Sequence, residues 1–123
     1  MIMATYIEIN NVRYPASITG RLNDKDWNNR ESKAIKVEMT YADAIANFVD
    51  DVAWNIIQEN EIPREVVDEE GNVTFKNVLE EEVYDNSDYC IAGDVVDHRD
   101  GTVTIKMGKP TAEELLALLE EVM

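Results

Sequence analysis

Apolar and polar residues alternate along two stretches near the amino terminus, which predicts a β-hairpin. The stretches cover residues 5–9 and 12–18, and they flank the dipeptide Asn10-Asn11. Asparagine tolerates the positive φ angles of a tight hairpin turn better than other non-glycine residues. Pro15 cannot donate a ladder hydrogen bond, so we expect the second strand to lie at a sheet edge, at least locally.

Further along the chain, three stretches also predict extended structure. Residues 20–31 are polar and rich in turn-forming types, which predicts a loop, and the alternating pattern resumes over residues 32–39. Short apolar runs at the two ends of residues 66–75 indicate a hairpin with short arms. Residues 89–107 favour a longer hairpin, whose Asp-Gly pair supplies the turn.

The clearest helical pattern follows the third strand. Thr40 is a typical N-cap, and apolar residues then recur with a period near 3.6, which predicts an amphipathic helix over residues 40–59. Pro63 disfavours helix in the residue before it, so the helix should end before that point. A competing interpretation ends the helix near Asp50 and makes residues 52–58 a strand.

A second helix is predicted at the carboxyl end, over residues 111–121. Thr111 and Glu114 match the capping box, in which the N-cap side chain and a glutamate three residues later satisfy each other's backbone amides. Leucines form the apolar stripe of this helix.

Together these elements predict an α+β fold, with a mostly antiparallel sheet of hairpins and two amphipathic helices packed on one of its faces. The length of 123 residues corresponds to a single domain. Within it, residues 61–88 contain 10 acidic and 2 basic side chains and the weakest apolar pattern. We interpret this segment as a solvated, partly mobile insertion.

The overall charge disfavours some classes of binding partner. The chain has 26 acidic and 11 basic residues, a formal charge of −15, which disfavours direct binding to nucleic acid or to an anionic membrane. No apolar run approaches the roughly 20 residues of a membrane span, and residues 1–11 do not resemble a signal peptide. The single cysteine, Cys90, cannot form an intramolecular disulfide. We therefore do not expect secretion by a signal peptide.

Two short motifs resemble functional loops but lack the partners that the chemistry needs. Residues 98–100 read His-Arg-Asp, as in a kinase catalytic loop, yet Ile105 stands where that loop needs asparagine. Residues 24–28 begin like an EF-hand loop, but the glycine and glutamate required at its sixth and twelfth positions are missing. Ordinary polar turns explain both motifs.

The chain contains few residues that could act as a catalytic nucleophile or bind a metal ion. Cys90 and His98 are the only cysteine and histidine, so the usual zinc sites cannot be built. If both lie on one extended strand, they are about 20 Å or more apart. We assign no catalytic residue, no metal ligand and no cofactor, expect no small-molecule substrate, and predict that the protein is not an enzyme.

The two tryptophans are the candidate interface residues. On the predicted helix, Trp54 falls on the polar face. We predict that it is exposed in the monomer and contacts another chain. The alternative is that a loop of the same chain covers it. Trp27 is the one large apolar residue of a polar loop. It either anchors that loop to the core or contacts another chain.

Four stretches of the sequence resemble small phage- and prophage-encoded proteins found among virion or tail-module genes. They are residues 7–16, which begin Ile-Glu-Ile-Asn-Asn and end Tyr-Pro-Ala, residues 20–29 around Trp27, residues 89–109, and the closing Glu/Leu-rich helix. The resemblance contains no catalytic residue, and it implies a structural, assembly or accessory role in a phage. It also implies a location in the cytoplasm of the host cell or in the virion.

Two classes of function remain open at this point. One is a non-enzymatic phage protein that acts through contacts with itself, as a homo-oligomer, or with other phage proteins. The other is an acidic inhibitor that mimics nucleic acid and occupies the basic groove of a host protein, because residues 61–123 have a net charge of −12. A small-molecule enzyme is a third and less favoured class.

Overall fold

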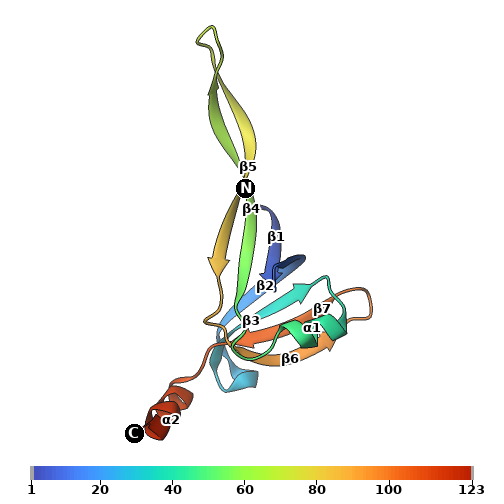
Figure 1. Ribbon diagram of the computed structural model, residues 1–123, viewed down its shortest axis with the longest axis vertical. Coiled ribbons are helices and arrows are strands. Elements are labelled where there is room, and N and C mark those ends of the chain that lie inside the picture. The colour runs from blue at the N-terminus through green and yellow to red at the C-terminus, as the bar shows by residue number, and fades with distance from the viewer. Residues whose placement is uncertain (1, 123) are drawn as a thin grey trace.

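The computed structural model describes residues 2–122, and within them seven strands form one antiparallel sheet accompanied by two α-helices (Figure 1). This confirms the predicted mixture of helices with a mostly antiparallel sheet. The order of strands across the sheet is β5-β4-β1-β2-β3-β7-β6. The elements are β1 (Ile2–Ile9), β2 (Val12–Asp24), η1 (Lys25–Trp27), β3 (Arg30–Val37), α1 (Tyr41–Asn47), β4 (Trp54–Val67), β5 (Val73–Asp85), β6 (Ile91–Asp97), β7 (Val103–Gly108) and α2 (Ala112–Val122).

Strand β2 connects the two halves of the sheet. Its first residues pair with β1, where Tyr6 faces Pro15, and the rest pairs with β3, where Ala16 faces Val37. Pro15 therefore lies where the strand changes partner, and its carbonyl accepts a hydrogen bond from the Glu38 amide at 3.0 Å. Although β2 lies inside the order of strands, its residues pair on one side with β1 up to Pro15 and on the other side with β3 from Ala16, so Pro15 does lie at a local edge, as expected.

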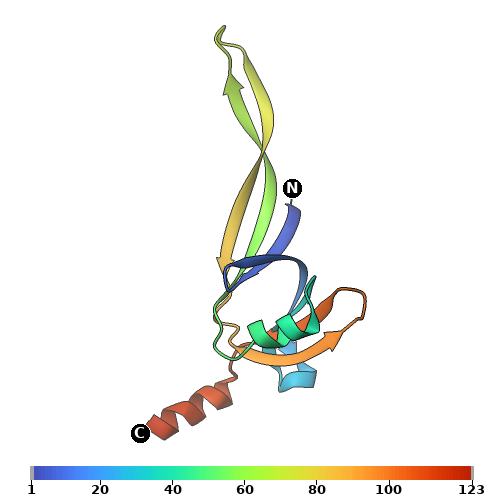
Figure 2. The ribbon, with the colours of Figure 1, turned by 45° about the vertical axis from the view of Figure 1, so that its right-hand side comes forward.

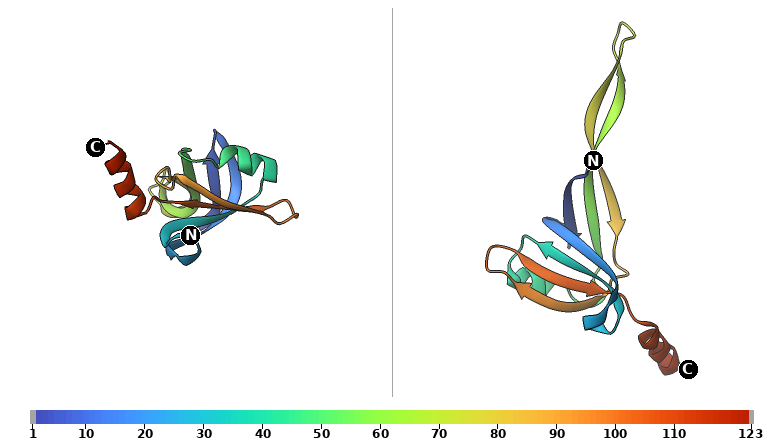
Figure 3. Two further views of the ribbon diagram at one scale, coloured as in Figure 1. Left: turned by 90° about the horizontal axis from the view of Figure 1, so that it is seen from below. Right: turned by 180° about the vertical axis from the view of Figure 1, so that it is seen from behind.

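The core lies between the two halves of the sheet, which enclose a common interior (Figures 2 and 3). Helix α1 covers it through Ala44 and Phe48, and α1 contacts β6 and β7. Full burial of each large apolar side chain stabilises the fold by about 1.5–3 kcal/mol. The most deeply buried large residues of the core are Trp54, Ile7, Ile9, Ile35, Ile105, Met107, Val37 and Val103.

The first turn agrees with the sequence in detail. Asn10 and Asn11 both adopt positive φ, 52° and 66°, as a two-residue hairpin turn requires. The following strands are longer than predicted, since β2 continues to Asp24 and β3 begins at Arg30, inside the stretch predicted to be a loop. The loop is therefore reduced to a short 3-10 turn.

The helix predicted over residues 40–59 is wrong in its length. Thr40 does cap α1, accepting a hydrogen bond from the Asp43 amide at 3.1 Å, but the helix ends at Asn47. Strand β4 begins at Trp54 and pairs with β1. The competing interpretation, with a strand over residues 52–58, is the correct one. In residues 54–59, backbone pairing with β1 outweighs the helical pattern of apolar residues.

The acidic segment 61–88 forms most of a long hairpin. Strands β4 and β5 pair without interruption from Asn55 facing Asp85 to Val67 facing Val73. The prediction of a hairpin at residues 66–75 is correct, but its arms are 14 and 13 residues long rather than short.

Helix α2 has the predicted capping box but not the predicted position. Thr111 donates its amide to Glu114 at 2.9 Å, and the Glu114 amide donates to the Thr111 hydroxyl at 3.2 Å. The helix extends away from the sheet (Figure 2), so packing of both helices on one face is not confirmed. Among the described residues, no helix has the length and apolar character needed to cross a bilayer.

Candidate interaction surfaces

The outer part of the β4–β5 hairpin projects beyond the sheet (Figure 1). Strand β1 accompanies β4 only as far as Asn60, which faces Ile2, so residues 61–79 form a two-stranded ribbon. We call these residues the ribbon. At about 3.3 Å per residue, it extends roughly 20 Å from the rest of the sheet. A two-stranded ribbon is marginally stable in water, so this one gains stability from anything that covers it.

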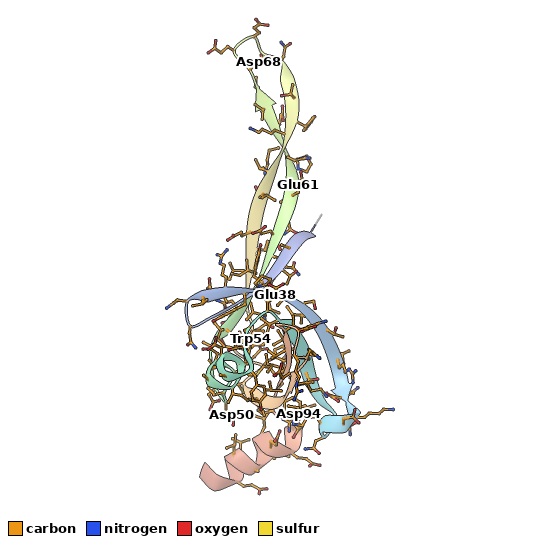
Figure 4. All side chains as sticks on the ribbon, turned by 90° about the vertical axis from the view of Figure 1, so that its right-hand side faces the viewer. Glu38, Asp50, Trp54, Glu61, Asp68 and Asp94 are labelled. Carbon is orange, nitrogen blue, oxygen red and sulfur yellow. The ribbon has the colours of Figure 1, made fainter. Side chains whose placement is uncertain are left out.

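The end of the ribbon is ordered by its own turn (Figure 4). The Asp68 carboxylate accepts hydrogen bonds from the amides of Glu70 and Asn72, at 3.0 and 2.8 Å. The Asn72 amide is the main reason why the pKa of Asp68 lies below its usual value. Gly71 has a φ of 84°, a conformation that other residues adopt with strain.

Large apolar side chains are exposed along the ribbon. Phe75 is 74% exposed and Leu79 63% exposed. An extended group of exposed apolar residues on a soluble domain is typical of a contact surface. The exposed apolar residues of the ribbon are Val66, Val67, Val73, Phe75, Val78 and Leu79.

The acidic side chains at the base of the ribbon are already engaged by groups of the same chain. Arg13 holds Glu81 with two hydrogen bonds, at 2.6 and 3.0 Å, and this contact is the main reason why the pKa of Glu81 is lowered. Arg64 pairs with Glu80, and the Tyr84 hydroxyl donates to Glu82. The row of glutamates is therefore a partly neutralised part of the sheet.

Helix α2 is fixed to the body at its first turn. Arg30 holds the Glu114 carboxylate at 2.8 and 3.2 Å and also donates to the Lys109 carbonyl at 3.1 Å. The Arg30 guanidinium carbon lies 4.6 Å from the centre of the Trp27 ring. The bond from Arg30, followed by that from the Thr111 amide, lowers the pKa of Glu114 to about 2.

Beyond this first turn, the leucines of α2 are uncovered. Leu115, Leu116, Leu118 and Leu119 are each at least half exposed. A helix of 11 residues is marginal in water without tertiary packing, so its apolar stripe is a second candidate contact surface.

Trp54 does not lie on any surface, which corrects the expectation of exposure. It is 1% exposed, and its ring meets Phe48 and Tyr89 edge to face, at centroid distances of 6.1 and 6.5 Å. The indole nitrogen donates to the Tyr89 carbonyl at 3.1 Å. The polar helical face on which Trp54 was placed does not exist, because the residue begins strand β4 and faces the core (Figure 4).

Trp27 is half-buried and fastens the 3-10 turn to the outer face of the sheet. Its ring lies over Gly93 and Gly108. A Cβ atom added at Gly93 would lie 2.7 Å from the ring, and a Cβ atom added at Gly108 would lie 2.9 Å from it. This is the anchoring role that the sequence left open. Its contact with another chain stays a prediction.

An open pocket of about 510 Å³ lies at the carboxyl end of β5, beside Tyr89. The ammonium groups of Lys33 and Lys109 lie 4.4 and 4.9 Å from the centre of the Tyr89 ring. Burial, and then a hydrogen bond to Glu31, raises the pKa of Tyr89 to about 12, while burial lowers the pKa of Lys33. The pattern of residues along the chain had not indicated this pocket, because its lining comes from four separate segments.

The carboxylates and lysines of this pocket form a connected network. Lys109 pairs with Glu31 at 3.1 Å and with Asp88 at 3.2 Å, whereas Lys33 donates to the amide oxygen of Asn86. The backbone N–H of Asn86 in turn donates to the Trp54 carbonyl at 2.9 Å. The network therefore fixes the connection between β5 and β6 against β3 and β4.

Cys90 and His98 lie before and after strand β6, so the strand separates them. His98 instead contacts the Thr104 hydroxyl, at 2.7 Å. Across residues 2–122, no three His, Cys, Asp or Glu side chains are grouped so that they could hold a metal ion.

Comparison with known proteins found no matching family model, no matching curated protein and no matching solved structure.

Proposed function

We propose that this protein is a non-enzymatic structural, assembly or accessory protein of a phage or prophage, and that it acts through contacts with other protein chains, including further copies of itself. The observation that carries the proposal is the pair of projecting elements, the ribbon and α2, whose large apolar side chains are exposed. Burying such side chains against another chain stabilises both elements, since neither is stable alone in water.

The sequence resemblance described above supports the phage context. The four stretches that resemble virion or tail-module proteins include α2 but not the ribbon. In this proposal the body is a scaffold that holds two contact elements in fixed directions.

The nucleic-acid mimic is the alternative function. An acidic row on β5 favours it, but these carboxylates face Arg13, Arg64 and the Tyr84 hydroxyl of the same chain. A mimic needs its carboxylates available to a basic groove. Six large apolar side chains of the ribbon are exposed beside its charges, and this favours assembly over mimicry.

Light scattering at low salt and at about 0.5 M salt tests the proposal. We expect a homo-oligomer at both, because apolar contacts persist when charges are screened over only a few ångströms. The double substitution Phe75→Ser and Leu79→Ser should weaken association. Leu22→Ser, which removes an equally exposed apolar side chain from the body, should leave association unchanged. A strict monomer that binds a basic nucleic-acid-binding protein and releases it on adding salt would favour the mimic.

A further inference from the structure

The two edges of the seven-stranded sheet differ in a way that indicates how copies can join. Strand β5 forms one edge and β6 the other. The β5 edge is 13 residues long, contains no proline, pairs with β4 without irregularity and is exposed over nearly all of its length. An open edge of this kind is a template for another strand.

The start of the β6 edge is protected by the same chain. The Asp50 carboxylate accepts a hydrogen bond from the Ala92 amide at 2.8 Å, and the Asp51 amide donates to the Cys90 carbonyl at 2.8 Å. The register of β6 also shifts between Ala92 and Val95. Joining β5 of one copy to β6 of another is therefore disfavoured, and pairing of two β5 edges is favoured.

We infer that two copies of this chain join through their β5 strands, antiparallel across a two-fold axis at Leu79, so that their sheets become continuous. This inference rests on the proposed function and names the partner of the ribbon as a second copy. A two-fold contact uses the same surface on both copies, and each contact therefore occurs twice.

The sequence of β5 is complementary to itself in this register. With the axis at Leu79, Lys76 of each copy faces Glu82 of the other, and Phe75 faces Val83. The two Leu79 side chains meet at the axis. Opposite charges and apolar side chains that face each other across antiparallel strands are stabilising pairs.

Neighbouring registers are less favourable. An axis at Glu80 brings the two Glu80 side chains together, and like charges directly opposite are destabilising. An axis at Val78 places Phe75 opposite Glu81. The Leu79 register is also the one that pairs every residue from Val73 to Asp85.

Lys76 gives independent support for an acidic neighbour. Within its own hairpin it faces Arg64, a second cation. Arg64 is neutralised by Glu80, but no carboxylate among the described residues lies within ion-pair distance of Lys76. In the two-fold arrangement, Glu82 of the second copy supplies that carboxylate, which keeps its charge because its partner within its own chain is the neutral Tyr84 hydroxyl.

Cysteine cross-linking of the full chain tests the register directly. In a Cys90→Ala background, Leu79→Cys places two thiols opposite each other, at the Cα separation of about 4.5–5.5 Å that a disulfide accepts. We expect a covalent dimer on mild oxidation that thiol reduces. The matched control is Asn77→Cys, on the same face of the same strand. Its two copies would be offset by four residues, about 13 Å, and should not cross-link.

A charge exchange provides a second measurement. Lys76→Glu places a glutamate opposite Glu82 in both pairs and should weaken dimerisation about tenfold or more in sedimentation equilibrium. Combining it with Glu82→Lys restores the pairs and should restore the affinity. Circular dichroism of each variant checks that the sheet is retained.

The outcomes separate this inference from the proposed function. If light scattering shows an oligomer but Leu79→Cys does not cross-link, or Asn77→Cys cross-links equally well, the β5 pairing is wrong while self-assembly stands. If the chain is a monomer at every concentration and salt, both are wrong. A cross-link specific to Leu79→Cys together with charge rescue establishes the two-fold pairing.

Discussion

The guanidinium of Arg30 and the carboxylate of Glu114 form a two-bond ion pair, at 2.8 and 3.2 Å, that connects the start of β3 with the first turn of α2. The Arg30 side chain is buried and stacks on Trp27, whereas that of Glu114 is 44% exposed. This contact determines the direction in which α2 leaves the body. The exposed leucines therefore lie on a helix whose first turn is fixed to the body.

Replacing Glu114 by glutamine should loosen α2 and cost about 1–3 kcal/mol of unfolding free energy, because a buried cation loses its charged partner. Amide hydrogen exchange should accelerate in α2 more than in the strands. The matched control is Glu113→Gln, which removes a neighbouring exposed charge and should change stability by less than about 0.5 kcal/mol. Equal effects of the two variants would contradict this role of the ion pair.

The same contact predicts how α2 responds to acid. The pKa of Glu114 is lowered to about 2, so the carboxylate binds protons less readily in the folded state than in the unfolded state. Its stabilising effect is therefore complete above about pH 4.5 and is lost as the pH falls through about 2. Carboxyl NMR shifts should show Glu114 titrating well below the ordinary range of a glutamate. Titration of Glu114 near pH 4.5 would contradict the prediction.

Truncating Trp54 to alanine should destabilise the isolated monomer by about 3–5 kcal/mol, because a large buried ring is removed from the core. Trp54→Phe should cost less but still lose the hydrogen bond to the Tyr89 carbonyl. Urea denaturation of a dilute sample measures both. If Trp54→Ala weakened association and left the stability of the monomer unchanged, the residue would belong to an interface after all.

Gly93 should not tolerate a side chain. An added Cβ would lie 2.7 Å from the Trp27 ring, so Gly93→Ala should force the ring outward and cost about 1–3 kcal/mol. Gly20→Ala is the matched control, since a Cβ at this strand position meets no atom within 4 Å. Thermal unfolding and tryptophan fluorescence report stability and ring position together. An unchanged midpoint for Gly93→Ala would show that Trp27 moves freely.

Several features of the fold could be predicted from local sequence alone. The Asn10-Asn11 turn, the N-cap at Thr40 and the capping box of Thr111 and Glu114 are all present. Each depends on groups within a few residues of one another. Their geometry is therefore determined by residue type and spacing, whatever the rest of the chain does.

The stretch after α1 shows where local reasoning fails. Val52, Trp54 and Ile56 alternate with period two, but the same stretch also fits a helical period of 3.6. The pairing of Ile9 with Trp54 decides between them, and it joins residues that are far apart in sequence. The sequence marked Trp54 as a residue that must be covered. Whether the core or another chain covers it depends on whether residues 54–59 form a helix or a strand.

The sequence by itself determined the first turn, the helix caps and the acidic charge. Only the tertiary structure decided that Trp54 is buried, that residues 61–79 project as a ribbon and that α2 leaves the sheet at Arg30. The physical reason is range. Capping and turn formation involve neighbours along the chain. Strand pairing and burial depend instead on which distant segment lies beside a given residue. The exposed edge of β5 is therefore defined only once every other strand has its partner.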